Sequence, residues 1–159
     1  MIKKTLIIGL GNPILRDDGI GIAVARELRK HVREHEGIDI KELSVGGLRL
    51  MEEMIGYDRV FLIDAICTGN APAGTVYRLS LRNVPATLHS SSMHDTTLAC
   101  AFEAGKRMGF DLPEDIAIWA VEAEDVVHFG DAMTDAVAAA MPRVVSLLVT
   151  ALEPMLSHP

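Results

Sequence analysis

The sequence predicts an α/β fold, a three-layer α/β/α sandwich around a mainly parallel, twisted sheet of roughly five strands. Two observations support this prediction. Continuous apolar runs, such as Val-Phe-Leu-Ile at residues 60–63, are typical of strands that are buried on both faces of a sheet. Between these runs lie segments in which apolar residues recur with the period of an amphipathic helix. Alternation of the two patterns favours a parallel sheet with helices on both faces.

In chain order, we expect strands at residues 3–9, 38–43, 59–63, 75–81 and 116–121, and helices at residues 18–33, 48–55, 94–108 and from 134 onward. Residues 38–43 alternate apolar and charged side chains, so this strand is expected near an edge of the sheet. The apolar run that begins after Arg59 predicts a central strand. The alternating strand at residues 75–81 is the candidate for an antiparallel direction.

Length and composition limit the class of protein. The 159 residues are expected to form a single domain, residues 1–159, and 49% hydrophobic residues with a mean hydropathy of +0.25 are enough for a full core. The net charge of −7 argues against nucleic acid or an anionic membrane as a partner. No apolar run reaches the roughly 18 residues that a membrane helix needs, and the run after Lys3 and Lys4 is too short for a signal peptide.

The two cysteines, Cys67 and Cys100, stand alone without CxxC spacing. This spacing gives no metal or disulfide framework, so we interpret both as small buried hydrophobic residues of a reduced protein. We therefore expect a cytoplasmic protein.

Polar side chains follow two of the predicted strands. Asp17 and Asp18 come after the first strand and a Gly-Leu-Gly-Asn turn at residues 9–12, and Asp64 ends the third strand. His94 stands at the start of a later helix, after an irregular serine-rich stretch. Ligands of such sheets bind beyond the carboxyl ends of the strands, where the strand order reverses. We therefore expect a carboxylate of the Asp17–Asp18 pair to meet Asp64 and His94 at this edge.

Two carboxylates and one imidazole would form a three-ligand site with open positions, which suits nickel, zinc or iron. A carboxylate at the end of a buried strand is costly unless it is paired or bound, which favours a functional Asp64. Each residue also has a structural alternative. Asp17 and Asp18 can cap the following helix, Asp64 can brace a neighbouring loop, and His94 can be a cap. His128 could line the same cleft, although an ordinary loop histidine is the simpler interpretation.

Other chemistries lack their motifs. The dinucleotide fingerprint GxGxxG needs a glycine where the chain has Ile14, which disfavours a nucleotide-binding domain. No GxSxG accompanies the serines at residues 90–92, and neither HExxH nor GxxxxGK[ST] is present.

Three segments in order resemble the nickel-iron hydrogenase maturation endopeptidases. The first is Gly-Leu-Gly-Asn-Pro-Ile-Leu-Arg-Asp-Asp-Gly-Ile-Gly at residues 9–21. The second is Phe-Leu-Ile-Asp-Ala at residues 61–65, followed by an Ala-Pro-Ala-Gly turn at residues 71–74. The third is Ser-Met-His at residues 92–94, at the opening of a helix. The resemblance extends over residues 2–149, almost the whole chain.

The resemblance implies a phosphorylase/hydrolase-like fold and an endopeptidase of the aspartyl type. Such an enzyme removes the C-terminal extension of the hydrogenase large-subunit precursor once nickel has been inserted. The family's metal-contacting residues correspond to Asp18, Asp64 and His94. They are thought to recognise nickel held in the substrate, so no permanent cofactor is expected, although a divalent metal can occupy the site. The precursor is the expected partner, without nucleic acid or membrane, and the enzyme is expected to be a monomer.

The chain departs from the family pattern in two places. An Asp-Gly-Gly-Thr-x-Gly stretch after the second strand is replaced by Leu-Ser-Val-Gly-Gly at residues 43–47, and a Pro-Glu pair after the last strand is replaced by Glu-Ala-Glu-Asp at residues 122–125. No dedicated nucleophile is identifiable, so the alternative function is a non-catalytic checkpoint or chaperone that binds the nickel site of the precursor. We also expect residues 90–93 to be mobile in the free enzyme and to become ordered with the precursor.

Overall fold

The structure is a computed structural model and describes residues 3–32, 37–84 and 97–156. Its centre is a five-stranded sheet in the order β2-β1-β3-β5-β4. The strands are β1 (Thr5–Leu10), β2 (Ile38–Leu43), β3 (Arg59–Ile66), β4 (Val76–Leu79) and β5 (Asp115–Glu122). All neighbouring pairs are parallel except β4 with β5. This confirms the edge position of β2, the central position of β3 and the antiparallel β4.

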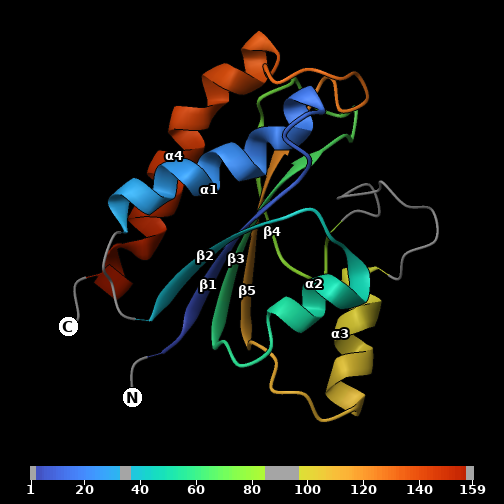
Figure 1. Cartoon of the computed structure of the whole chain (residues 1–159), viewed down its shortest axis with the longest axis vertical. Coiled ribbons are helices and arrows are strands. Elements are labelled where there is room, and N and C mark those ends of the chain that lie inside the picture. The colour runs from blue at the N-terminus through green and yellow to red at the C-terminus, as the bar shows by residue number, and fades with distance from the viewer. Residues whose placement is uncertain (1–2, 33–36, 85–96, 157–159) are drawn as a thin grey trace.

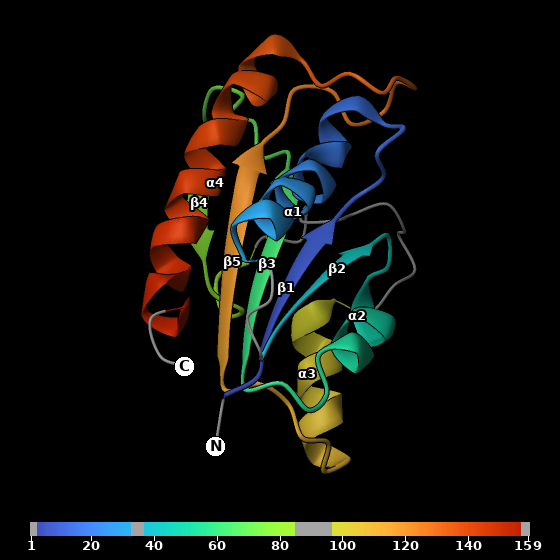
Figure 2. The same cartoon turned by 60° about the vertical axis from the view of Figure 1, so that its left-hand side comes forward.

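Helices cover both faces of the sheet, which confirms the three-layer prediction (Figure 1). The helices are α1 (Ile20–His31), α2 (Gly47–Glu53), α3 (Leu98–Arg107) and α4 (Asp135–Leu156), and a 3-10 turn, η1 (Arg16–Gly19), precedes α1. Helices α1 and α4 lie on one face, while α2 and α3 lie on the other (Figure 2). Two apolar cores result, one under each pair of helices.

The alternation of side chains along the central strands explains both cores. In β3, Phe61 and Ile63 belong to the core under α1 and α4, whereas Val60 and Leu62 belong to the core under α2 and α3. Successive side chains of a strand point to opposite faces, so a strand covered on both faces must be apolar at every position. This is the origin of the continuous apolar run in the sequence.

Gly21 brings the start of α1 against the ends of β1 and β3. A Cβ atom at this position would lie 2.3 Å from the carbonyl oxygens of both Leu10 and Ile63. A side chain would therefore push the helix away from the sheet, so the last glycine of the Gly-Ile-Gly segment is needed for this close approach. The approach places η1 directly beyond the carboxyl ends of the two central strands.

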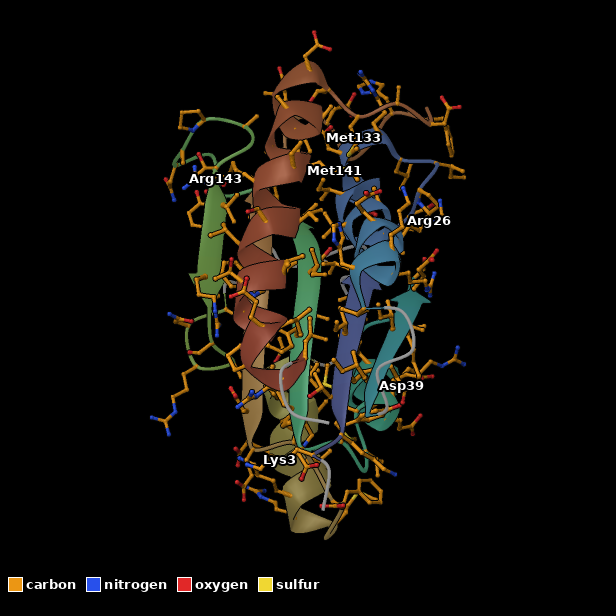
Figure 3. The ribbon with its side chains drawn as sticks, turned by 90° about the vertical axis from the view of Figure 1, so that its left-hand side faces the viewer. Lys3, Arg26, Asp39, Met133, Met141 and Arg143 are labelled. Carbon is orange, nitrogen blue, oxygen red and sulfur yellow. The ribbon has the colours of Figure 1, made fainter. Side chains whose placement is uncertain are left out.

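Helix α4 is the one helix of the described residues that is long and apolar enough to cross a membrane by length and composition, with 22 residues and a hydropathy of 1.6. The continuous apolar run in the sequence is shorter than this helix because Arg143 interrupts it. Figure 3 shows α4 lying beside α1 along the sheet. Val137, Val144 and Leu148 are fully buried in the core on this side, so α4 packs on the sheet through one face.

Candidate active site

The strand order reverses at β1, and we use the word crevice for the position beyond the carboxyl ends of β1 and β3. From β1 the chain first adds β2 on one side and then returns to place β3 on the other side. The crevice at the carboxyl ends of β1 and β3 is where open α/β sheets bind ligands. Asp18 lies in η1, just after β1, and Asp64 lies near the end of β3. The structure therefore brings the two predicted carboxylates to the same edge.

Asp64 is fully buried although it carries a carboxylate. It pairs in register with Ala120 of β5, and its Oδ1 accepts a hydrogen bond of 2.8 Å from the backbone N–H of Ala65. The strand continues to Ile66 rather than ending at Asp64, so the prediction of a strand end is wrong by two residues. The continued pairing with β5 fixes the backbone on both sides of the carboxylate.

Neither aspartate of the Asp-Asp pair caps α1, so the capping alternative is wrong. The N-cap residue of α1 is Gly19, without a side-chain hydrogen bond, because η1 comes between the pair and the helix. Oδ2 of the partly buried Asp18 instead accepts a hydrogen bond of 2.8 Å from the backbone N–H of Asn12. This contact holds the carboxylate beside the Gly-x-Gly turn.

Asp17 is fully buried and fixes the loop between β5 and α4. Its carboxylate accepts hydrogen bonds of 2.9, 2.9 and 2.7 Å from the backbone N–H groups of Glu124, Asp125 and Thr134, and further ones from the Thr134 hydroxyl. The donors come from more than a hundred residues away in the chain. The role of Asp17 is therefore structural, and in the sequence only the family resemblance separates it from Asp18.

The charges of both candidate carboxylates act on the thiol of Cys67. Desolvation raises the pKa of its thiol, and the negative charges of Glu122, Asp18, Asp17 and Asp64 raise the pKa further. The prediction that Cys67 and Cys100 are buried is wrong, because both are exposed. Cys67 follows Ile66, the last residue of β3, at the point where the chain leaves the core. The topology brings Asp18 and Asp64 to the sheet edge at which Cys67 leaves β3.

Glu122 is a buried carboxylate that sequence reasoning missed as a site residue. It accepts hydrogen bonds from the backbone N–H groups of Thr68 and Gly69 and from the hydroxyls of Thr68 and Tyr77. Burial alone would raise the pKa of Glu122, but these hydrogen bonds outweigh burial and hold the pKa below its ordinary value. The signal was present in the sequence, because Glu122 follows an apolar strand just as Asp64 does.

Asp125 links the loop between β5 and α4 to the 3-10 turn η1. Its Oδ2 lies 3.0 Å from Nη1 of Arg16, and its Oδ1 lies 3.1 Å from Nδ1 of His128. Hydrogen bonds from the His128 backbone and side chain, together with Val127 and Arg16, hold the pKa of Asp125 well below its ordinary range. His128 is exposed and held to its own loop, in agreement with an ordinary loop histidine.

The divergent segment at residues 43–47 packs against the Gly-x-Gly turn. The Ser44 hydroxyl donates a hydrogen bond to the carbonyl oxygen of Gly11, and the Gly11 N–H donates one of 3.0 Å to Leu43. Gly47 has a φ of 52°, which favours the retained glycine. The segment therefore supports the turn that carries Asp18, although it lacks the acidic residue and the threonine of the family pattern.

His94 and residues 90–93 lie outside the described residues. Within the described ranges, no group of three or more His, Cys, Asp and Glu side chains is placed to hold a metal ion. The three-ligand set of Asp18, Asp64 and His94 therefore stays a prediction, of which the structure places two members at one edge.

Solved structures define the class of this fold. The hydrogenase maturating endopeptidase HybD from Escherichia coli superposes with a TM-score of 0.80 at 24% sequence identity, over 95% of this chain and 93% of that chain. The nickel-iron hydrogenase maturation protease HybD from Thermococcus kodakarensis superposes with a TM-score of 0.66 at 23% identity, over 93% and 98% of the two chains. The fold is that of the hydrogenase maturation endopeptidases.

The sequence comparisons agree with the fold. The hydrogenase 2 maturation protease of Escherichia coli strain K12 is 26% identical over 129 residues, which cover 80% of this chain and 78% of that protein. The family model described as hydrogenase maturation protease matches residues 22–151. The chain belongs to the hydrogenase maturation protease family, and it is a peptide hydrolase.

Proposed function

We propose that this protease removes the C-terminal extension of a hydrogenase large-subunit precursor and that it recognises nickel already bound in that substrate. The observation that supports the proposal is that Asp18, in η1 after β1, and Asp64, near the end of β3, lie at the sheet edge where the strand order reverses. The proposed enzyme acts as a monomer in the cytoplasm, where the precursor is assembled.

The donor set suits nickel as part of the substrate. Carboxylates from Asp18 and Asp64 and an imidazole from His94 are ligand types that bind nickel, with positions left open for groups of the precursor. Since the ion arrives with the substrate, the enzyme needs no permanent metal of its own. A precursor without nickel would then lack the ion that these three side chains bind.

The protein residues can supply acid–base chemistry for hydrolysis. A water molecule held by Asp18 or Asp64 attacks the scissile carbonyl and transfers its proton to the carboxylate. The resulting intermediate collapses as the C–N bond breaks, and the proton passes to the leaving amine. Nickel in the substrate supplies positive charge that polarises the carbonyl oxygen. The buried position of Asp64 limits competing water around this step.

The test compares wild type with Asp64→Asn on nickel-loaded and nickel-free precursor. We expect the wild type to cleave only the loaded form, and Asp64→Asn to lower the rate roughly 100-fold or more because a catalytic acid–base group is lost. The matched control is Asp111→Asn, whose exposed side chain lies at the other end of the sheet and leaves the rate unchanged.

Two outcomes would contradict the proposal. A lasting wild-type complex with an intact precursor C-terminus would favour the non-catalytic checkpoint. A thermal melt of Asp64→Asn that collapses together with activity would make Asp64 a structural residue.

A further inference from the structure

Two loops beside the crevice expose large apolar side chains. Ile14 is 54% exposed in the loop before η1, and Val127 and Phe129 are 75% and 82% exposed in the loop between β5 and α4. We name these three residues the Phe129 patch. Figures 1 and 2 both show the orange β5–α4 loop beside the blue segment that leads into α1.

The backbone joins the two loops at this patch. The N–H of Gly130 donates to the carbonyl oxygen of Ile14 at 2.9 Å, and the N–H of Arg16 donates to the carbonyl oxygen of Gly130 at 3.0 Å. Arg16 has a φ of 46°, a conformation that is costly for a side chain other than glycine and that is held here by these contacts. The three apolar side chains are therefore presented by an ordered backbone.

The segment that bears Ile14 leads directly to the proposed site residue Asp18. Asp17 fixes the β5–α4 loop through its buried carboxylate, and Asp18 follows directly in η1. The Phe129 patch is thus joined to Asp18 through the 3-10 turn η1 and through the contacts of Asp17 with the β5–α4 loop. A protein substrate that reaches Asp18 would also cover this surface.

The charges around the patch select its occupant. Arg16 is neutralised by its ion pair with Asp125, whereas Glu124 and Asp131 form no ion pair within the described residues. Glu124 and Asp131 flank the segment that bears Val127 and Phe129, and Asp18 follows Ile14 by four residues, so acidic side chains border the apolar residues along both segments. A second copy of this chain, with a net charge of −7, would place acidic groups against acidic groups.

We propose that the Phe129 patch docks an apolar segment of the hydrogenase large-subunit precursor that is flanked by lysine or arginine. This inference rests on the proposed function for the identity of the partner. Apolar side chains at the centre and charges at the rim are the usual arrangement of a protein interface. The patch determines the affinity for the precursor, while the crevice performs the cleavage.

The double variant Val127→Ser, Phe129→Ser tests the docking surface. We expect KM for the nickel-loaded precursor to rise roughly 10-fold or more, because truncated aromatic anchors commonly cost this much affinity. The value of kcat should stay within about 2-fold, since neither residue contacts the reacting atoms. The melting temperature should not fall, because both side chains are already exposed.

The matched control is the double variant Met108→Ser, Phe110→Ser. These side chains are 68% and 38% exposed after α3, at the other end of the sheet from the crevice. Figure 3 shows the two ends, with Lys3 near the amino ends of the strands and Met133 of the β5–α4 loop at the opposite end. We expect KM of this control to equal that of the wild type. A rise in KM for the control would mean that the effect is not specific to the patch.

The charge of the rim gives a second test. Asp131→Lys should also raise KM, and added salt should raise the KM of wild type more than that of this variant. An unchanged KM in both the patch variant and Asp131→Lys would overturn the proposal. The proposal would also be overturned if the wild type sediments as a dimer at assay concentration and the patch variant sediments as a monomer. The patch would then be occupied by a second copy of the chain.

Binding of intact precursor separates this inference from the proposed function. Wild type that binds the precursor without cleaving it, with binding lost in the patch variant, would refute the proposed cleavage and support the docking surface. If the wild type cleaves the precursor and the patch variant has an unchanged KM, the proposed cleavage is supported and the docking surface is refuted.

Discussion

Replacement of the buried Asp17 by asparagine is expected to unfold the protein at a markedly lower temperature. The carboxylate accepts hydrogen bonds from three backbone N–H groups, two at Oδ2 and one at Oδ1. An amide can present only one oxygen, so in either orientation its NH₂ group faces at least one of these donors. The variant therefore leaves one or two buried N–H groups without an acceptor.

The magnitude follows from the number of lost contacts. A hydrogen bond to a charged group contributes about 1.5–3 kcal/mol, so the loss of one or two reduces the free energy of unfolding by roughly 2–5 kcal/mol. For a chain of this size, such a loss lowers Tm by roughly 4–20 °C. Thermal and urea melts, with agreement between two spectroscopic probes, would measure the change.

Two controls make the measurement specific to Asp17. Asp18→Asn removes a carboxylate one residue away that, among the described residues, accepts a hydrogen bond from the Asn12 N–H, and we expect a loss of about 1 kcal/mol. Asp111→Asn changes the charge alone at an exposed position and should leave Tm unchanged. An Asp17→Asn protein that melts within about 2 °C of wild type would refute the assigned structural role.

Two further predictions concern acid and nickel. Because the pKa of Glu122 is lowered in the folded state, its stabilising contribution is present above the unfolded value near 4.3 and is lost as pH falls through the folded pKa. Glu122→Gln should therefore destabilise the protein at pH 7, and its urea midpoint should fall less than that of wild type below about pH 4; parallel curves would contradict this. We also expect the free enzyme to bind nickel weakly in titration calorimetry, since the remaining ligands come from the precursor. Nanomolar affinity that His94→Ala abolishes would instead show a preformed metal site.

Much of the fold could be predicted because local pattern and global packing agree. The run of apolar residues in β3 is stable only as a central strand that is covered on both faces. The alternation of apolar and charged residues in β2 fits only a strand at an edge of the sheet. The positions of Asp18 and Asp64 followed from topology alone, since the carboxyl ends of parallel strands meet at one edge. These predictions needed no knowledge of contacts between distant residues.

The remaining features depend on such contacts. Cys67 is exposed because the chain leaves the core just after Ile66, and the sequence gives no sign of where β3 ends. Glu122 is buried because Thr68, Gly69 and Tyr77 supply donors from another strand and its preceding loop. No local pattern encodes which loop supplies those donors.

The Asp-Asp pair shows how this structure divides two roles between adjacent and chemically identical residues. In a 3-10 turn each residue advances about 120° around the axis, so neighbouring side chains diverge. Asp17 consequently faces the β5–α4 loop and is buried, while Asp18 faces the Gly-x-Gly turn and lies close enough to Cys67 to raise its pKa. The buried residue fixes the turn that positions the accessible residue and also fixes the loop that bears the Phe129 patch. Substitution of Asp17 should therefore lower Tm strongly and impair cleavage and docking together, whereas substitution of Asp18 should impair cleavage with a much smaller change in Tm.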